Sequence, residues 1–173
     1  MKTWQIIGSY LRRGVEFLGI GSFANFQVSP STSQSLVMVL FQEKNIKLEH
    51  LTSFLDVLSG SLPLAIAVSG PDSRAVFDYM LRLLGSKSLG AHIMTKLCDE
   101  GNVSDALNCF FWSTWPSEER FDEWKNYSVV AVGDESYQEA VLRECGRFLR
   151  GKEEAKEDSG DYSRTKGTSK PED

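Results

Sequence analysis

The sequence predicts an α/β fold, in the form of a three-layer α/β/α sandwich around a mostly parallel sheet of four or five strands. An N-terminal helical segment is expected to precede this sheet. Short apolar runs alternate four times with stretches of helical periodicity. Each interval between runs is long enough for the crossover helix that neighbouring parallel strands require. The length of 173 residues and the apolar content of 41% suit one domain with a sizeable core.

Residues 1–35 are expected to form a helix and a connector that pack on the domain. Apolar residues recur at helical spacing from Trp4 to Leu18, and Gly19 and Gly21 would end such a helix. A helix lying on a membrane surface is the alternative, but such helices usually carry more Lys and Arg on their polar face. We therefore expect this segment to cover part of the domain.

The α/β domain is expected to span residues 36–150. Its strands are predicted at 36–41, 64–68, 91–95 and 128–132, where nearly continuous apolar runs are typical of strands buried on both faces. These strands should be mutually parallel. Their central residues should be almost fully buried, namely Val39, Ile66, Val68, Ile93 and Val130.

Residues 151–173 are predicted to form a disordered, charged tail. The segment contains seven acidic and five basic residues. Apart from Ala155 and Tyr162, all of its residues are polar, charged, Gly or Pro. Such a composition cannot bury enough apolar surface to offset the entropy lost on ordering.

The charge and the apolar pattern exclude two classes of partner. The formal net charge is −5, whereas a nucleic-acid surface needs clustered Lys and Arg to neutralise phosphates. No apolar run approaches the ~20 residues that cross a bilayer. We therefore expect neither nucleic-acid binding nor a membrane span.

Cysteine and histidine usage argues against a disulfide framework and a metal site. The three cysteines, Cys98, Cys109 and Cys145, are odd in number and form no CxxC motif, which indicates a reducing, cytoplasmic location. Neither His50 nor His92 stands near a second ligand type at metal spacing. No metal and no cofactor are expected.

One candidate ligand site lies where the predicted strands end, the edge at which open α/β sheets bind ligands. The turn after the second strand offers helix-start amides, the hydroxyls of Ser69 and Ser73 and the guanidinium of Arg74, all of which suit a phosphate. Asp99 and Asp134 follow the third and fourth strands. The turn lacks the GxxxxGK[ST] and GxGxxG motifs, so ordinary turn formation and helix capping compete with this interpretation.

The second candidate site is an aromatic and acidic segment. Three of the four tryptophans lie between residues 110 and 124, and the stretch from Asp99 to Glu135 has nine acidic and two basic residues, a net charge of −7. A short helix is expected after Pro116, with Phe121 and Trp124 turned inward. Tryptophan beside charge is typical of protein interfaces. The predicted interaction residues are Trp112, Trp115, Glu118, Glu119, Asp122 and Glu123.

Together these patterns favour a non-catalytic protein-interaction or regulatory module that binds a partner protein with a basic surface. The alternative is a small enzyme or sensor that binds a phosphorylated or nucleotide ligand at the C-terminal edge of the strands. A serine nucleophile would need a GxSxG turn and a nearby histidine, and the sequence has neither arrangement. No catalytic residue and no oligomeric state are assigned.

Overall fold

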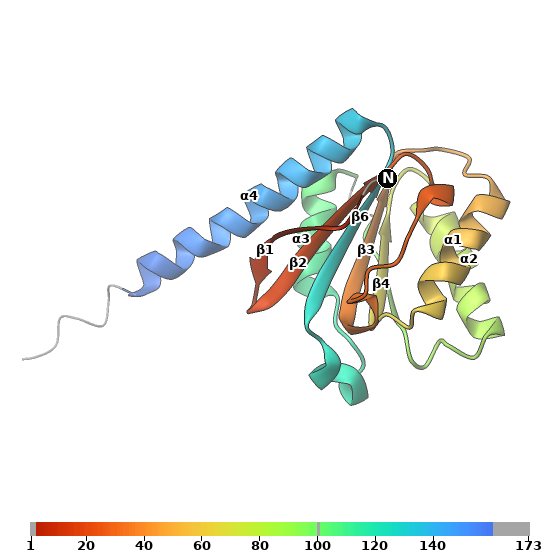
Figure 1. The fold of residues 1–173 in the computed structure, drawn as a ribbon, viewed down its shortest axis with the longest axis horizontal. Coiled ribbons are helices and arrows are strands. Elements are labelled where there is room, and N and C mark those ends of the chain that lie inside the picture. The colour runs from red at the N-terminus through yellow and green to blue at the C-terminus, as the bar shows by residue number, and fades with distance from the viewer. Residues whose placement is uncertain (1–2, 100, 161–173) are drawn as a thin grey trace, which may run out of the picture.

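The computed structural model describes residues 3–99 and 101–160, with side chains described as far as residue 151. Within them the chain is a mixed α/β fold built on a six-stranded, mostly parallel sheet (Figure 1). The elements in chain order are β1 (Gln5–Tyr10), β2 (Arg13–Ile20), η1 (Phe23–Asn25), η2 (Thr32–Gln34), β3 (Ser35–Phe41), α1 (Leu48–Gly60), β4 (Ala65–Ser69), α2 (Ser73–Ser86), β5 (Met94–Leu97), α3 (Val103–Ser113), η3 (Glu118–Glu123), β6 (Asn126–Val132) and α4 (Glu135–Gly160).

Three of the predicted strands are present as β3, β4 and β6, and the strand predicted at 91–95 is displaced to β5 at Met94–Leu97. The prediction that these strands are parallel is confirmed. The strand order is β1-β2-β6-β3-β4-β5. In the centre of the sheet Val39 lies opposite both Val130 and Val68. All five predicted core residues are at most 1% exposed. Four of them are buried because β3, β4 and β6 are covered on both faces, whereas Ile93 lies just before β5 and packs in the apolar cluster on one face.

The prediction of an N-terminal helix is wrong. Residues 5–20 form an antiparallel hairpin, β1 and β2, which raises the sheet to six strands rather than four or five. The two-residue turn places Leu11 and Arg12 at positive φ, the backbone geometry of a tight β-hairpin. β2 then pairs in parallel with β6 from Gly14 to Ile20. β2 is a buried strand because it pairs with a strand more than 100 residues away in the sequence. The free energy of that pairing outweighs the local preference for a helix.

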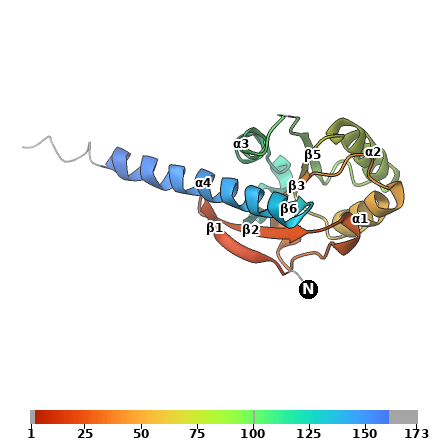
Figure 2. The same cartoon turned by 90° about the horizontal axis from the view of Figure 1, so that it is seen from above.

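Two apolar clusters fill the two faces of the sheet. α1, α2 and η1 cover one face, where Phe54 and Leu58 pack against Val39 and Ile66. α3 and α4 cover the other face, where Phe110 is buried. Figure 2 shows the two pairs of helices on opposite sides of the strands. The helices that follow the strands are therefore packed against the sheet, and they fix the positions of the loops that join them to the strands.

The last helix, α4, is longer than the sequence predicts. It crosses over β6, β2 and β1 and continues past the edge of the sheet (Figure 1). Its final turns, residues 151–160, belong to the segment predicted to be a disordered tail. Lys, Glu and Ala favour helix, and extending an existing helix requires no new nucleation. The rest of the predicted tail, 161–173, lies outside the described residues.

Among the helices in the described part of the chain, none combines the length and apolar character needed to cross a membrane.

Candidate functional site

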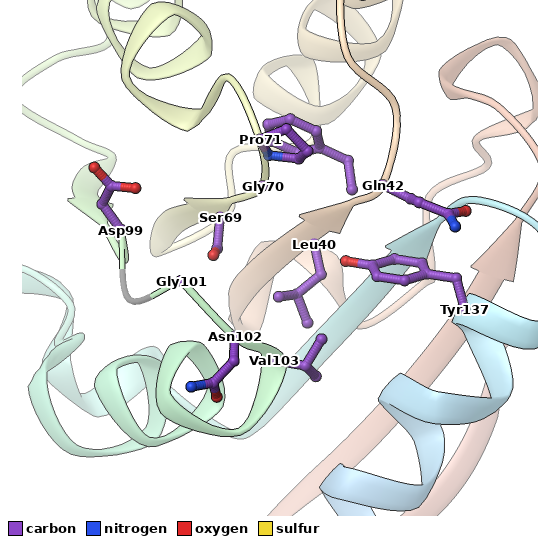
Figure 3. A pocket seen from close by; sticks show the side chains of 11 residues that line it. Leu40, Gln42, Ser69, Gly70, Pro71, Asp99, Gly101, Asn102, Val103 and Tyr137 are labelled. Atoms are coloured by element: carbon purple, nitrogen blue, oxygen red, sulfur yellow. The ribbon is translucent and has the colours of Figure 1, made fainter.

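The C-terminal ends of the parallel strands surround a cavity of about 370 Å³. It lies close to the point where the chain order reverses, since β3 leads to α1 on one face and β6 leads to α4 on the other. Open α/β sheets bind ligands at such switch points. Figure 3 shows that the cavity is lined by the ends of β3 and β4, the start of α3 and the first turn of α4.

Two of the five predicted ligand residues line this cavity, and the other three do not. Ser69 and Asp99 form part of its wall. The Ser73 hydroxyl donates a hydrogen bond to Asp99 Oδ1 (3.2 Å), so Ser73 positions that carboxylate from outside the lining. Arg74 is exposed on the first turn of α2. Asp134 caps α4 by accepting a hydrogen bond from the Tyr137 amide, the structural role that competes with ligand binding.

Two hydroxyl groups are directed into the cavity from opposite walls (Figure 3). Ser69 is only 8% exposed, yet its Oγ has no hydrogen-bond partner among the described residues. The Tyr137 hydroxyl faces it across the side chains of Leu40 and Val103. Burial raises the pKa of Tyr137 to about 12. Like any tyrosine hydroxyl at neutral pH, it is protonated and can both donate and accept a hydrogen bond.

Two glycines make this arrangement possible. A Cβ at Gly70 would lie 2.5 Å from ring atoms of Phe41, so only glycine lets the end of β4 pass so close to β3. A Cβ at Gly133 would lie 2.7 Å from the ring of Tyr137. Tyr137 was missed at the sequence level. The sequence feature that could have identified it is its position, as an aromatic residue in the first turn of the helix after the last strand.

At the opposite edge of the sheet lies an exposed group of aromatic side chains, which we call the aromatic platform: Trp115, Phe121 and Trp124 with the guanidinium of Arg13. Trp124 is buried, and the rings of Trp115 and Phe121 pack edge-on against it at 5.6 and 5.7 Å between centroids. The guanidinium of Arg13 lies 3.8 Å from the centre of the Trp124 ring. Trp115 is 48% exposed and Phe121 is 42% exposed.

The outward position of Phe121 contradicts the prediction that it turns inward, whereas the same prediction for Trp124 is confirmed. The segment is a 3₁₀ helix rather than an α-helix. It ends at Glu123, and Trp124 follows it with extended backbone, so Phe121 and Trp124 do not share one helical face.

Arg120 fixes the platform to the N-terminal ends of the strands. Its guanidinium donates hydrogen bonds to the Glu123 carboxylate and to carbonyl groups in the loops before β3, β4 and β5: Ser33, Leu62, Pro63 and His92. The hydrogen bond from Arg120 holds the pKa of Glu123 below its usual value. Sequence reasoning missed Arg120, although it is the single basic residue between Asp99 and Trp124.

The remaining predicted interaction residues are all exposed but do not form one cluster in the contacts of the structure. Glu118, Glu119 and Asp122 are exposed on η3 and make no ion pair with the described residues. Trp112 is 57% exposed on α3, beside Asn108 at a shallow depression. Of the two tryptophans, therefore, it is Trp115 that the platform holds in place.

Within residues 3–99 and 101–160, no group of three or more His, Cys, Asp and Glu side chains could hold a metal ion. No family model, curated protein or solved structure matches the chain.

Proposed function

We propose that this chain is a non-catalytic interaction or regulatory module of the α/β type that binds a partner protein with a basic surface. The interaction residues are Trp112, Trp115, Glu118, Glu119, Asp122 and Glu123. The observation that carries the proposal is the half-exposed ring of Trp115, which packs on the buried Trp124. The exposed carboxylates follow it in the chain on η3. A large aromatic side chain held at a protein surface is the usual anchor of an interface.

The rigidity of the aromatic platform supports this function. Arg120 ties η3 to the loops before three strands, and the Arg13 Nε donates a hydrogen bond to the Trp124 carbonyl (3.1 Å). A surface ordered before binding loses less conformational entropy when a partner docks. The exposed part of Trp115 is therefore available for contact at low cost.

The charge around the platform indicates the kind of partner. Glu118, Glu119 and Asp122 remain exposed without ion pairs in the described structure, and Arg120 is only 16% exposed and already paired with Glu123. These three carboxylates add negative charge to a surface that also carries Arg13 and Lys125. A positively charged partner would be drawn toward this edge, and salt would slow the encounter.

Two finer features belong to the same proposal. A Rossmann-like, three-layer α/β/α arrangement is supported by the apolar clusters on both faces of the sheet. A cytoplasmic setting is supported by the three cysteines, which are all free thiols.

The first experiment measures which tryptophan a partner can reach. Acrylamide quenching of tryptophan fluorescence should detect accessible components in the wild type that shrink in Trp112→Phe and in Trp115→Phe. Trp124→Phe serves as the matched control, because Trp124 is 3% exposed. If neither Trp112→Phe nor Trp115→Phe removes an accessible component, both rings are covered and the proposal fails.

The second experiment tests the partner. Proteins captured by the wild-type chain at low salt should be lost with Trp115→Ala and with the double variant Glu118→Lys, Glu119→Lys. The matched control is Glu43→Lys, Asp78→Lys, which reverses two exposed charges elsewhere. Trp115→Ala should weaken the binding of a purified partner by about 2 kcal/mol or more if the ring is a hot spot. Equal capture by the reversed and control variants would contradict the acidic surface.

The alternative function, a small enzyme or sensor for a phosphorylated or nucleotide ligand at the C-terminal edge, draws support from the cavity. Its weak point is charge, since Asp99 is the one charged residue among the described residues that line the cavity. Titration of nucleotides and sugar phosphates against the wild type and Arg74→Ala tests it. Binding that Arg74→Ala weakens would favour the alternative.

A further inference from the structure

The cavity at the C-terminal edge of the sheet contains polar groups that the protein itself does not satisfy. Ser69 is buried to more than nine-tenths, and its hydroxyl has no partner among the described residues. The Tyr137 hydroxyl points into the same space and likewise has no described partner. Tyr137 is only half-buried, so both hydroxyls stay open to the cavity. Two hydroxyls that face one cavity and have no described partner are free to bond to a molecule that enters it.

The charge of the cavity limits what that molecule can be. No Lys or Arg is among its described lining residues, and the one charged group is the carboxylate of Asp99. That carboxylate accepts a hydrogen bond from Ser73 and turns toward the start of α2 rather than into the cavity. A phosphate would gain no counter-charge from the lining and would lie near a negative one. The groups that do point inward are uncharged.

The remaining walls are apolar. Leu40 and Val103 lie between the two hydroxyls, and Pro71 stands at the mouth of the cavity (Figure 3). The volume of about 370 Å³ is at the lower end of the range for small-molecule sites. These walls suit a ring with an apolar face and hydroxyl groups at its rim.

We propose that this cavity binds a small, uncharged, hydroxylated ring, of the kind found in monosaccharides and nucleosides, with Ser69 and Tyr137 hydrogen-bonded to its hydroxyl groups. Ser69 and Tyr137 act as donors or acceptors from opposite walls, and Leu40 and Val103 contact the face of the ring. The site lies at the other edge of the sheet from the aromatic platform, so it does not depend on the interaction function.

Calorimetric titration tests the proposal with two sets of probes: ribose, glucose and galactose as monosaccharides, and adenosine, guanosine, cytidine and uridine as nucleosides. Each probe is compared with its phosphorylated counterpart. We expect at least one uncharged probe to bind in the micromolar to millimolar range, and its phosphorylated form to bind more weakly. The set that binds identifies the class. If no uncharged probe binds at millimolar concentration, or if the phosphorylated forms bind more tightly, the proposal is overturned.

Three variants locate the binding site. Ser69→Ala and Tyr137→Phe each remove one hydroxyl without changing the shape of the cavity, and each should weaken binding by roughly three- to tenfold. Val103→Phe should fill part of the cavity and reduce binding further. Tyr79→Phe is the matched control, because the Tyr79 hydroxyl bonds to Thr52 on the helices away from the cavity (2.7 Å) and its loss should leave binding unchanged. Unaltered binding in both Ser69→Ala and Tyr137→Phe would overturn the proposal even if a probe binds.

Discussion

The two edges of the sheet differ in the shape and the side chains that they present to a ligand. At the N-terminal edge, Arg120 makes hydrogen bonds to four carbonyl groups and a carboxylate, and aromatic side chains project outward from this framework. At the C-terminal edge, the hydroxyls of Ser69 and Tyr137 face a cavity without described partners. One edge presents a projecting surface, whereas the other presents a space.

This difference separates two kinds of recognition. A rigid projecting surface suits a macromolecule, which can cover it without entering it. A concave site with unsatisfied hydroxyls suits a small molecule, which can supply the missing hydrogen bonds. A single sheet can serve both because parallel strands leave their two ends far apart, each with its own set of loops.

The largest expected effect is at the aromatic platform. Trp124→Ala should lower the free energy of unfolding by about 3–5 kcal/mol, the usual cost of removing a buried tryptophan. Trp124 is 3% exposed and packs against Trp115, Phe121 and Tyr127. Urea denaturation followed by circular dichroism measures the loss. A loss below about 1 kcal/mol would show that the platform is not a packed unit.

Removal of the Arg120 side chain should have the next largest effect. Arg120→Met should cost about 2–3 kcal/mol, because bonds to a charged group are strong and several carbonyl groups lose their donor. Arg120→Lys should restore little, since an ammonium group cannot reproduce the planar fork. Arg147→Met, which breaks only an exposed pair with Glu144, is the control and should cost less than about 0.5 kcal/mol. Equal losses in urea for Arg120→Met and the control would contradict the central role of Arg120.

A smaller effect is expected at the cavity edge in alkaline solution. Burial raises the pKa of Tyr137 from 10 to about 12, so the folded state keeps this proton at pH values where the unfolded state releases it. The associated stability is complete below pH 10 and is lost as the pH rises toward 12, about 1.4 kcal/mol of it by pH 11. Urea denaturation at pH 9 and pH 11 should therefore show a smaller decrease for Tyr137→Phe than for the wild type. Identical decreases would place the Tyr137 hydroxyl in water. Cys145 and Tyr127, whose pKa values burial also raises, are present in both proteins.

The smallest expected effect concerns Ser69. In the absence of ligand, Ser69→Ala should change the free energy of unfolding by less than about 0.5 kcal/mol, because its hydroxyl makes no hydrogen bond to the described residues. Ser73→Ala, which removes the bond to Asp99, should cost about 1 kcal/mol. Thermal denaturation of the two variants compares them directly. A larger loss for Ser69→Ala than for Ser73→Ala would mean that Ser69 is already satisfied, and it would weaken the case for a ligand.

The two edges also differ in how far the sequence predicts them. The platform comes mostly from residues 115–124, so the excess of tryptophan and acidic residues is visible in one short stretch. The cavity draws on the ends of two strands and the starts of two helices. The sequence singled out Ser69 and Asp99, which follow predicted strands, but it did not find Tyr137, and it included Arg74 and Asp134, which the fold leaves outside the lining.

The sequence by itself determined the parallel strands β3, β4 and β6 and their buried residues, because long apolar runs separated by helical periods are local patterns. The tertiary structure decided the N-terminal hairpin, since β2 is a strand only by virtue of its pairing with β6. It also decided the side on which Phe121 and Tyr137 lie. The hairpin and the orientation of these side chains depend on contacts between segments far apart in the chain. The free energy of such contacts outweighs local preference, and it cannot be read from the spacing of apolar residues.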